Sequence, residues 1–263
     1  MTTEEVEQQH DPGQAVALAW VASNDVKYNF FHSMLELLGW DIANHGRVWQ
    51  GGYVGMRMGT DGLVDARNKG VATFLDEKRA DWLFWLDADM GFAADTLDRL
   101  FEAADPVERP IVGALCFTQR ETESDNMGGW VCHATPTIFD WTHYKDQQGF
   151  AVRWDYPADT VTRCHGTGSA CILIHRSVFE RIQDEFGPVW YHRAPNISTG
   201  QLISEDLSFC VRANALDIPI YVHTGVRSTH QKTIWLGEQD YWQQRAVNPP
   251  PVTVDDMKAA DGG

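Results

Sequence analysis

The stretch WLFWL, residues 82 to 86, is the sequence feature that most constrains the fold of this chain. It holds five consecutive large apolar residues, and two acids, Asp87 and Asp89, follow it closely. A short apolar run without alternation is typical of a strand buried on both faces, as in parallel sheets. Both faces of such a strand must be covered, usually by helices. The stretch therefore predicts an α/β fold.

Strand-like and helix-like patterns alternate on either side of this stretch. Further strands are predicted at residues 15 to 23, 47 to 59 and 109 to 117, and a glycine pair favours a β-bulge in the second of them. Amphipathic helices are predicted at residues 29 to 41, 62 to 80 and 93 to 104. This alternation is typical of a doubly wound sheet with helices on both faces. Ligands of such sheets bind beyond the carboxyl ends of the strands.

The second half of the chain has a different pattern. Residues 119 to 166 combine aromatic residues with turn signals and predict hairpins. A strand running into a helix, a short helix and a final strand are predicted at residues 166 to 182, 204 to 217 and 218 to 230. The polar segments at residues 1 to 13 and 246 to 263 predict disordered tails.

Charge and cysteine content restrict the class of protein. The net charge of −16 argues against broad electrostatic capture of nucleic acid, although a local basic patch leaves a nucleic-acid acceptor open. No secretory signal or membrane span is evident, so we expect a cytoplasmic protein. Five cysteines without CxxC spacing indicate reduced thiols. Two Cys-His pairs, Cys132-His133 and Cys164-His165, leave a zinc site open, although adjacent strand residues point to opposite faces.

The two acids after WLFWL are separated by one alanine. An extended backbone places the side chains of Asp87 and Asp89 on the same side, where carboxylates roughly 6 Å apart repel by about 3 kcal/mol at an effective dielectric near 20. Water, a raised pKa or a divalent cation relieves such repulsion. In the structural alternative, Asp89 lies in the turn before a helix that Asp95 caps.

Five motifs, in this order, resemble those of nucleotide-sugar-dependent glycosyltransferases of GT-A fold, particularly the family-2-like group and related phage-type enzymes. They are ARN at 66 to 68, LDADM at 86 to 90, TGSACILIHRSVFERI at 167 to 182, SEDLSFCVRA at 204 to 213 and STHQK at 228 to 232. The resemblance covers much of residues 15 to 235. It implies a single domain with a Rossmann-type sheet, in which residues 14 to 118 bind the nucleotide sugar and residues 119 to 245 bind the acceptor and carry catalysis.

The resemblance also implies a metal-dependent transfer, expected to be of a hexosyl group from a UDP-sugar. Mn²⁺ or Mg²⁺ stabilises the departing diphosphate as a Lewis acid. The implied metal ligands are Asp87, Asp89 and His230, and the alternative for His230 is an ordinary surface histidine. Further contacts to the nucleotide, the sugar or the diphosphate are implied for Ser23, Asn24, Arg67, Asn68, Asp87 and Lys232.

On the acceptor side, the resemblance implies that Asp206 is the general base, with Glu205 beside it, in an inverting reaction. The structural alternative is that both acids begin a helix capped by Ser204. Gly168 is expected to allow close approach of the acceptor, and Trp190 or Trp130 to stack on it, unless these tryptophans pack in the core or a loop. A modified pyrimidine in phage DNA, a virion or cell protein and a glycan are all open as acceptors.

Two other classes of protein stay open. A DxD-dependent phosphohydrolase would also use paired acids and a metal, but DADMGF lacks the DxDGT-like continuation of that class. A non-catalytic module would bind a nucleotide sugar without turnover. Metal-dependent release of phosphate from simple esters distinguishes the first class, and binding without turnover distinguishes the second.

Overall fold

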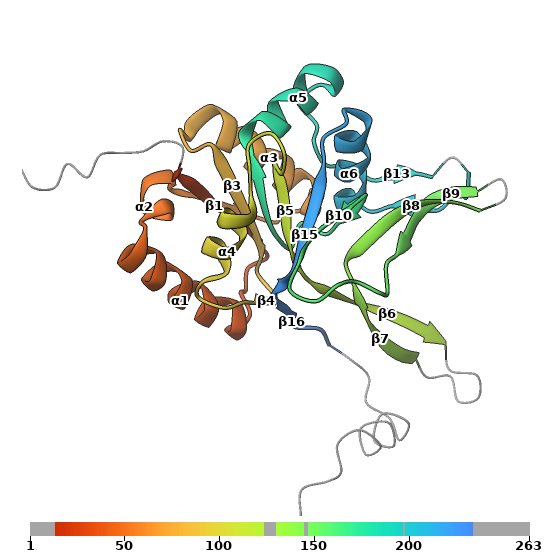
Figure 1. Ribbon diagram of the computed structural model, residues 1–263, viewed down its shortest axis with the longest axis horizontal. Coiled ribbons are helices and arrows are strands. Elements are labelled where there is room, and N and C mark those ends of the chain that lie inside the picture. The colour runs from red at the N-terminus through yellow and green to blue at the C-terminus, as the bar shows by residue number, and fades with distance from the viewer. Residues whose placement is uncertain (1–13, 124–129, 145–146, 197, 234–263) are drawn as a thin grey trace, which may run out of the picture. The chain divides into compact units, whose positions relative to one another are not determined.

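The computed structural model describes residues 14 to 123, 130 to 144, 147 to 196 and 198 to 233 (Figure 1). The chain divides into two compact units: Met1–Thr118 with Ala134–Gln231, and Gln119–His133 with Lys232–Gly263. The tails predicted at residues 1 to 13 and 246 to 263 lie outside the described residues. The predicted division into a donor half and an acceptor half, with its boundary after residue 118, stays a prediction.

A seven-stranded mixed sheet forms the centre of the first unit, in the order β10-β15-β5-β12-β3-β1-β2. Its strands are β1 (Val16–Ala22), β2 (Tyr53–Arg57), β3 (Trp82–Asp87), β5 (Ile111–Leu115), β10 (Val161–Cys164), β12 (Cys171–His175) and β15 (Ile220–Arg227). β1 runs parallel to β2 and β3, and β15 runs parallel to β5. β12 lies antiparallel between β3 and β5, and β10 is an antiparallel edge strand. The predicted α/β class is confirmed, with mixed rather than uniform strand direction.

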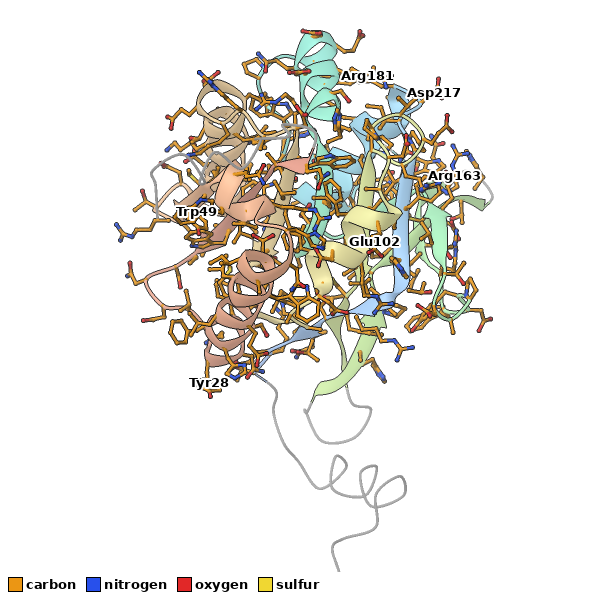
Figure 2. The ribbon with its side chains drawn as sticks, turned by 60° about the vertical axis from the view of Figure 1, so that its left-hand side comes forward. Tyr28, Trp49, Glu102, Arg163, Arg181 and Asp217 are labelled. Carbon is orange, nitrogen blue, oxygen red and sulfur yellow. The ribbon has the colours of Figure 1, made fainter. Side chains whose placement is uncertain are left out.

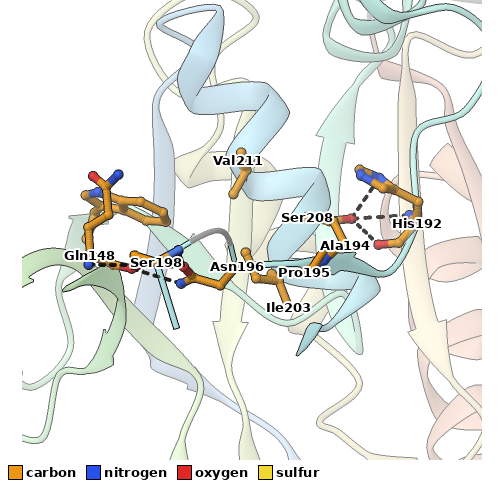
Figure 3. Close-up of a pocket in the computed structure, with 10 residues that line it drawn as sticks. Gln148, His192, Ala194, Pro195, Asn196, Ser198, Ile203, Ser208 and Val211 are labelled. Atoms are coloured by element: carbon orange, nitrogen blue, oxygen red, sulfur yellow. Dashed lines mark hydrogen bonds between the residues drawn. The ribbon is translucent and has the colours of Figure 1, made fainter. Parts of the chain in front are cut away.

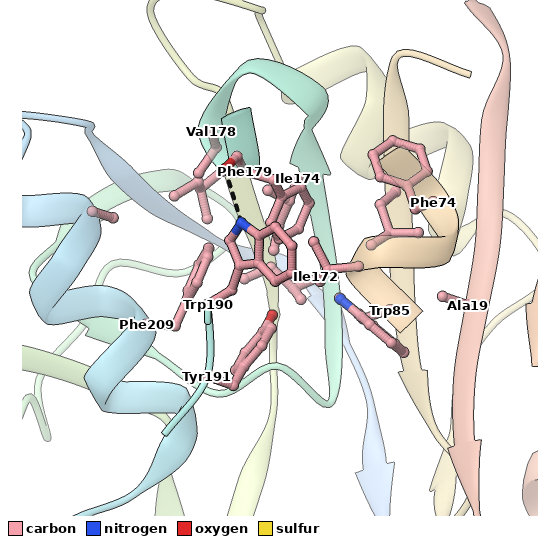
Figure 4. Close-up of a cluster of buried hydrophobic side chains, with 14 of the residues drawn as sticks. Ala19, Phe74, Trp85, Ile172, Ile174, Val178, Phe179, Trp190, Tyr191 and Phe209 are labelled. Carbon is pink, nitrogen blue, oxygen red and sulfur yellow. Dashed lines mark hydrogen bonds between the residues drawn. The ribbon is translucent and has the colours of Figure 1, made fainter. Parts of the chain in front are cut away.

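Helices cover both faces of the sheet because successive residues of β3 point to opposite sides. Leu83 and Trp85 belong to one buried cluster, drawn in Figure 4, to which α3, α5 and α6 contribute. Trp82, Phe84 and Leu86 belong to the other, with α1, α2 and α4. All five side chains are buried, which confirms the reading of WLFWL. The helices are α1 (Tyr28–Asn44), α2 (Arg47–Gly51), α3 (Gly62–Glu77), α4 (Thr96–Ala103), α5 (Arg176–Phe186) and α6 (Glu205–Ala215).

The strand predicted over residues 47 to 59 is wrong in its first half. Arg47–Gly51 forms the helix α2, whose exposed Trp49 is labelled in Figure 2, and the strand starts at Tyr53. The glycine pair makes no bulge, since Gly52 has a φ of 79° and its N–H donates to the carbonyl of Val48 to end the helix. The carboxylate of Asp41 accepts hydrogen bonds from the first N–H groups of α2, at 2.9 and 3.0 Å. A distant cap therefore starts this helix.

Short strands complete the described structure and confirm the predicted hairpins. β8 (Ile138–Tyr144) pairs with β9 (Gln147–Val152) and with β11 (Gly166–Thr167). The other pairs are β4 (Met90–Gly91) with β16 (Thr229–His230), β13 (Ala194–Pro195) with β14 (Leu202–Ile203), and β6 (Phe117–Glu123) with β7 (Trp130–Pro136). Among the described helices, none has the length and apolar character that crossing a membrane requires.

Candidate functional site

The short strands β4 and β16 bring two of the sequence motifs together. Their pairing sets His230 opposite Met90, next to the end of the DAD motif. The Nε2 atom of His230 lies 3.0 Å from Oδ2 of Asp89, and its Nδ1 atom lies 2.9 Å from the carbonyl oxygen of Phe117. A ring whose Nδ1–H donates to a backbone carbonyl presents Nε2 to a proton or a metal ion. The pair Asp89-His230 thus has the orientation that a metal site needs.

A buried arginine joins Asp87 to Asp206. Arg67, in α3, is fully buried, and its Nη2 atom lies 2.9 Å from Oδ1 of Asp87 and 3.7 Å from Oδ1 of Asp206. The rings of Trp85 and Tyr191 lie 5.5 and 5.6 Å from the guanidinium carbon. Guanidinium groups suit such positions, because they stack on aromatic rings while pairing with carboxylates. Arg67 is therefore not part of a solvated helix face, and it fixes the two aspartates relative to each other.

Burial raises the pKa of both aspartates that Arg67 joins. For Asp87, desolvation is the largest cause, Arg67 acts against it, and Asp206 and Asp89 add to it. For Asp206, desolvation is again the largest cause, Arg67 opposes it, Glu205 adds to it, and hydrogen bonds from Ser169 oppose it. The ionised carboxylates are therefore costly in this place, and a further cation nearby would lower that cost.

The first turn of α6 holds Glu205 and Asp206 in different surroundings. Ser204 caps the helix, with its hydroxyl oxygen accepting from the N–H of Leu207 at 3.4 Å, so the structural alternative for this motif is confirmed. Glu205 is buried and lies 3.9 Å from Nε of Arg193. A cap of this kind is compatible with a catalytic role, because a helix start holds its side chains in place.

Gly168 leaves the space beside Asp206 open. A Cβ atom built on Gly168 would lie 3.9 Å from Oδ2 of Asp206 and 3.8 Å from Cβ of Thr137, which are ordinary contact distances. The fold therefore tolerates a side chain here, and the absence of one keeps a face of the carboxylate accessible. Sequence reasoning did not single out Ser169, which hydrogen-bonds Asp206, although it stands in the same TGSAC motif.

A surface pocket lies beside the DAD motif, at the carboxyl end of β1. Its lining consists of Val21, Ala22, Ser23, Asp25, Lys27, Met58, Leu63, Asp87, Ala88 and Asp89. Ser23 is among these residues, as the predicted nucleotide contact requires, while the Oδ1 atom of Asn24 accepts a hydrogen bond from Arg57. Sequence reasoning missed Lys27. Its N–H donates to the carbonyl of Ala88 at 3.0 Å, and within the described residues its ammonium group has no ion pair.

Four predicted site residues lie elsewhere or serve other contacts. Both amide atoms of Asn68 hydrogen-bond the backbone of Trp190 and Tyr191, so this side chain anchors that segment to α3. Trp190 is 2% exposed and its indole N–H donates to the carbonyl of Phe179, so it packs in the core (Figure 4). Lys232 is exposed and belongs to the second unit, as does Trp130, whose side chain is outside the described part. The roles predicted for Lys232 and Trp130 stay predictions.

Metal-binding groups of three or more His, Cys, Asp or Glu side chains are absent from the described residues. Asp87 is turned toward Arg67, which leaves Asp89 and His230 as the facing pair. For the zinc alternative, Cys164 is buried and His165 is exposed, as opposite faces of a strand require. The side chain of Cys132 lies outside the described part of the chain.

Comparisons with known proteins gave two similar solved structures and no sequence match. No family model matches the chain, and no curated protein matches it. The structure "A197 from STIV" is 14% identical, with a TM-score of 0.44, over 83% of this chain and 86% of that one. "GalNAc-T7 with UDP, GalNAc and Mn2+" is 14% identical, with a TM-score of 0.49, over 84% of this chain and 44% of that one. At these TM-scores the function rests on the site itself.

Proposed function

We propose that this protein is a metal-dependent glycosyltransferase, which moves a sugar from a nucleotide-diphosphate sugar, expected to be a UDP-sugar, to an acceptor hydroxyl. The observation that carries the proposal is the convergence of three motifs at one end of the sheet. Asp87 and Asp89 end β3, His230 reaches Asp89, and Asp206 shares the buried guanidinium of Arg67 with Asp87. These residues come from separate parts of the sequence.

The residues present fit a divalent cation that is held jointly with a diphosphate. Mn²⁺ and Mg²⁺ accept carboxylate, imidazole and phosphate ligands, and Mg²⁺ in particular is usually bound by one or two carboxylates together with substrate phosphates. Asp89 and His230 would hold the cation, and the nearby carboxylate of Asp87 would add negative charge on the same side. When bound, the cation would stabilise the diphosphate leaving group.

Asp206 is the proposed general base. As the acceptor oxygen bonds to the anomeric carbon, its proton passes to Asp206, and the bond from that carbon to the diphosphate breaks on the opposite side. A carboxylate whose pKa is raised by burial is a better proton acceptor than an exposed one. Arg67 holds Asp206 in a fixed position relative to Asp87, and Gly168 leaves room for the acceptor.

The pocket beside the DAD motif is the proposed donor site. Ser23 would contact the nucleotide, and Lys27 would place a positive charge against the diphosphate. The unpaired ammonium of Lys27 stands among acids, since Asp25, Asp87 and Asp89 line the same pocket. A dianionic diphosphate with one divalent cation brings no net charge, so Lys27 would counter the carboxylates that stay uncompensated.

The test is a turnover assay with several donors. Purified protein is incubated with Mn²⁺ and UDP-glucose, UDP-galactose, UDP-N-acetylglucosamine or GDP-mannose, together with a mixture of candidate acceptors, and the release of UDP or GDP is measured. We expect release from at least one donor, and its loss with EDTA and in Asp89→Ala. The matched control is Asp76→Ala, an exposed acid on α3. Phosphate release from simple esters without use of any nucleotide sugar would replace the proposal with a phosphohydrolase.

A further inference from the structure

Two adjoining pockets beside the start of α6 are lined by uncharged residues alone, as far as the structure describes them. The first lies against the outer side of α6, with Ser208 and Val211 from the helix and His192 beside it (Figure 3). The second is lined by Ser204 and Leu207, which flank the acids of the same helix, and by the β8–β9 hairpin. Gln148, Asn196 and Ile203 line both, so the two pockets form one continuous neutral surface.

The neutrality of this surface is unusual for the chain. Asp, Glu, Lys and Arg make up 22% of the sequence, yet none of them lines either pocket. The charges in neighbouring segments are paired with each other: Arg153 donates to Asp140 at 2.8 Å, and Arg193 lies 3.9 Å from Glu205. Nucleic acid binding depends on Lys and Arg against phosphates, so this surface does not suit a nucleic acid.

The chemistry of the lining combines a fixed aromatic ring with free polar groups. The ring of Trp141 meets that of Phe150 edge-on, with centroids 5.0 Å apart, so its orientation is held. The side-chain amide of Gln148 has no hydrogen-bond partner among the described residues. His192 is bound at Nδ1 by the Ser208 hydroxyl, 3.2 Å away, which leaves Nε2 for a ligand. Burial lowers the pKa of His192, with Arg212 acting in the same direction, so the ring is neutral.

We propose that the two pockets bind a neutral saccharide, namely the part of a glycan acceptor that extends away from the reacting hydroxyl. A pyranose ring offers a C–H face to Trp141 and hydroxyl groups to the amide and imidazole. The position beside Ser204 and Leu207 puts such a ligand next to the helix turn that carries Asp206. The assignment to an acceptor rests on the proposed function, whereas the saccharide site itself does not.

Ligand-observed NMR on the full chain, without donor, tests the site. The probes are cellobiose, maltose, lactose and chitobiose as neutral saccharides, and heparin fragments and a short single-stranded DNA as charged competitors. We expect a neutral saccharide to bind, and Trp141→Ala and Gln148→Ala to weaken its binding at least tenfold. Trp49→Ala is the matched control, because Trp49 is 75% exposed on α2 and lines neither pocket (Figure 2). Gln148→Ala removes only an exposed side chain, so it reports on binding even if Trp141→Ala fails to fold.

The outcomes separate this inference from the proposed function. No binding of any neutral saccharide, a preference for the charged probes, or unchanged binding by Gln148→Ala and a folded Trp141→Ala would overturn the inference. Turnover of a nucleotide sugar is measured on the same preparations. A protein that binds saccharides but uses no nucleotide sugar loses the proposed function and keeps the site, whereas turnover without saccharide binding removes the site alone.

Discussion

The two sides of α6 contrast sharply in electrostatics. On one side, Asp206 joins a cluster in which a buried arginine holds two carboxylates whose pKa is raised. On the other, Ser208 and Val211 face pockets without any charged lining residue in the described structure. Buried charge is costly to keep, so a fold retains it where a function needs it. The contrast indicates a charged donor with its cation at the first region and an uncharged acceptor at the second.

The largest expected effect comes from removing the charge of Asp206. Asp206→Asn keeps the shape of the side chain and removes the proposed base, so we expect transfer activity to fall by roughly 10² to 10⁴. The activity of each variant is measured with a fixed donor and acceptor. Asp184→Asn, an exposed acid on α5, serves as the matched control and should keep full activity. Comparable activity in both variants would remove Asp206 from the mechanism.

The same variant makes a second prediction about stability. Because the folded-state pKa of Asp206 lies above its ordinary value of 3.8, the free energy of unfolding falls as the pH rises from 3.8 through that higher pKa. Asparagine does not titrate. Urea unfolding should therefore show Asp206→Asn to be more stable than the wild type at pH 7 and nearly equal to it at pH 3. The opposite order at pH 7 would mean that Arg67 outweighs the cost of burial.

Arg67 is expected to matter for stability as much as for activity. Arg67→Met leaves Asp87 and Asp206 without their shared cation, so we expect a loss of about 3–5 kcal/mol in the free energy of unfolding at pH 7. The loss should be smaller at pH 4, where protonation neutralises more of the two carboxyls. Arg67→Lys keeps the charge without the planar group and should fall between the two. An unchanged unfolding curve for Arg67→Met would show that the carboxylates are not costly.

Gly168 connects the charged cluster to the acceptor side, and its expected effect is intermediate. The added Cβ of Gly168→Ala fits without a close contact but occupies space beside Asp206. We expect an unchanged melting temperature and about tenfold lower transfer, equivalent to roughly 1.4 kcal/mol of transition-state stabilisation. Gly39→Ala, in the interior of α1 with open space around it, is the matched control. Equal activity of the two alanine variants would place the acceptor elsewhere.

The smallest expected effect concerns Lys27 in the donor pocket. Its ammonium is exposed, so its attraction to a diphosphate is screened, and we expect Lys27→Ala to raise the KM for the donor about fivefold with little change in kcat, equivalent to roughly 1 kcal/mol. Lys69→Ala, an exposed lysine paired with Asp65 on α3, is the control. An unchanged KM for the donor would remove Lys27 from the donor site.

The sequence predicted those parts of the fold that local patterns encode. WLFWL was read correctly because burial on both faces shows directly in an unbroken apolar run. The helix α2 was missed because its start depends on Asp41, six residues away, and no apolar period marks it. The antiparallel direction of β12 was missed as well, since a strand's residue pattern does not state which way it runs among its neighbours.

For the site, motif order selected the acids and His230, while burial was harder to predict. Arg67 is followed by Asn68 and Lys69, a sequence that resembles a solvated helix face, and only the packing of Trp85 and Tyr191 shows that it is enclosed. The neutral pockets gave no signal in the sequence. Their lining comes from hairpins and a helix that are distant along the chain, and it is the absence of charge that characterises them.

The central claim is tested most directly by the effect of nucleotide sugars on the melting temperature with Mn²⁺ and with EDTA. A ligand that binds the folded protein raises its melting temperature by mass action. The account predicts that at least one UDP- or GDP-sugar raises it in the presence of Mn²⁺, and that EDTA or His230→Ala abolishes the shift. No shift with any nucleotide sugar, or an equal shift with EDTA and in His230→Ala, would contradict the account.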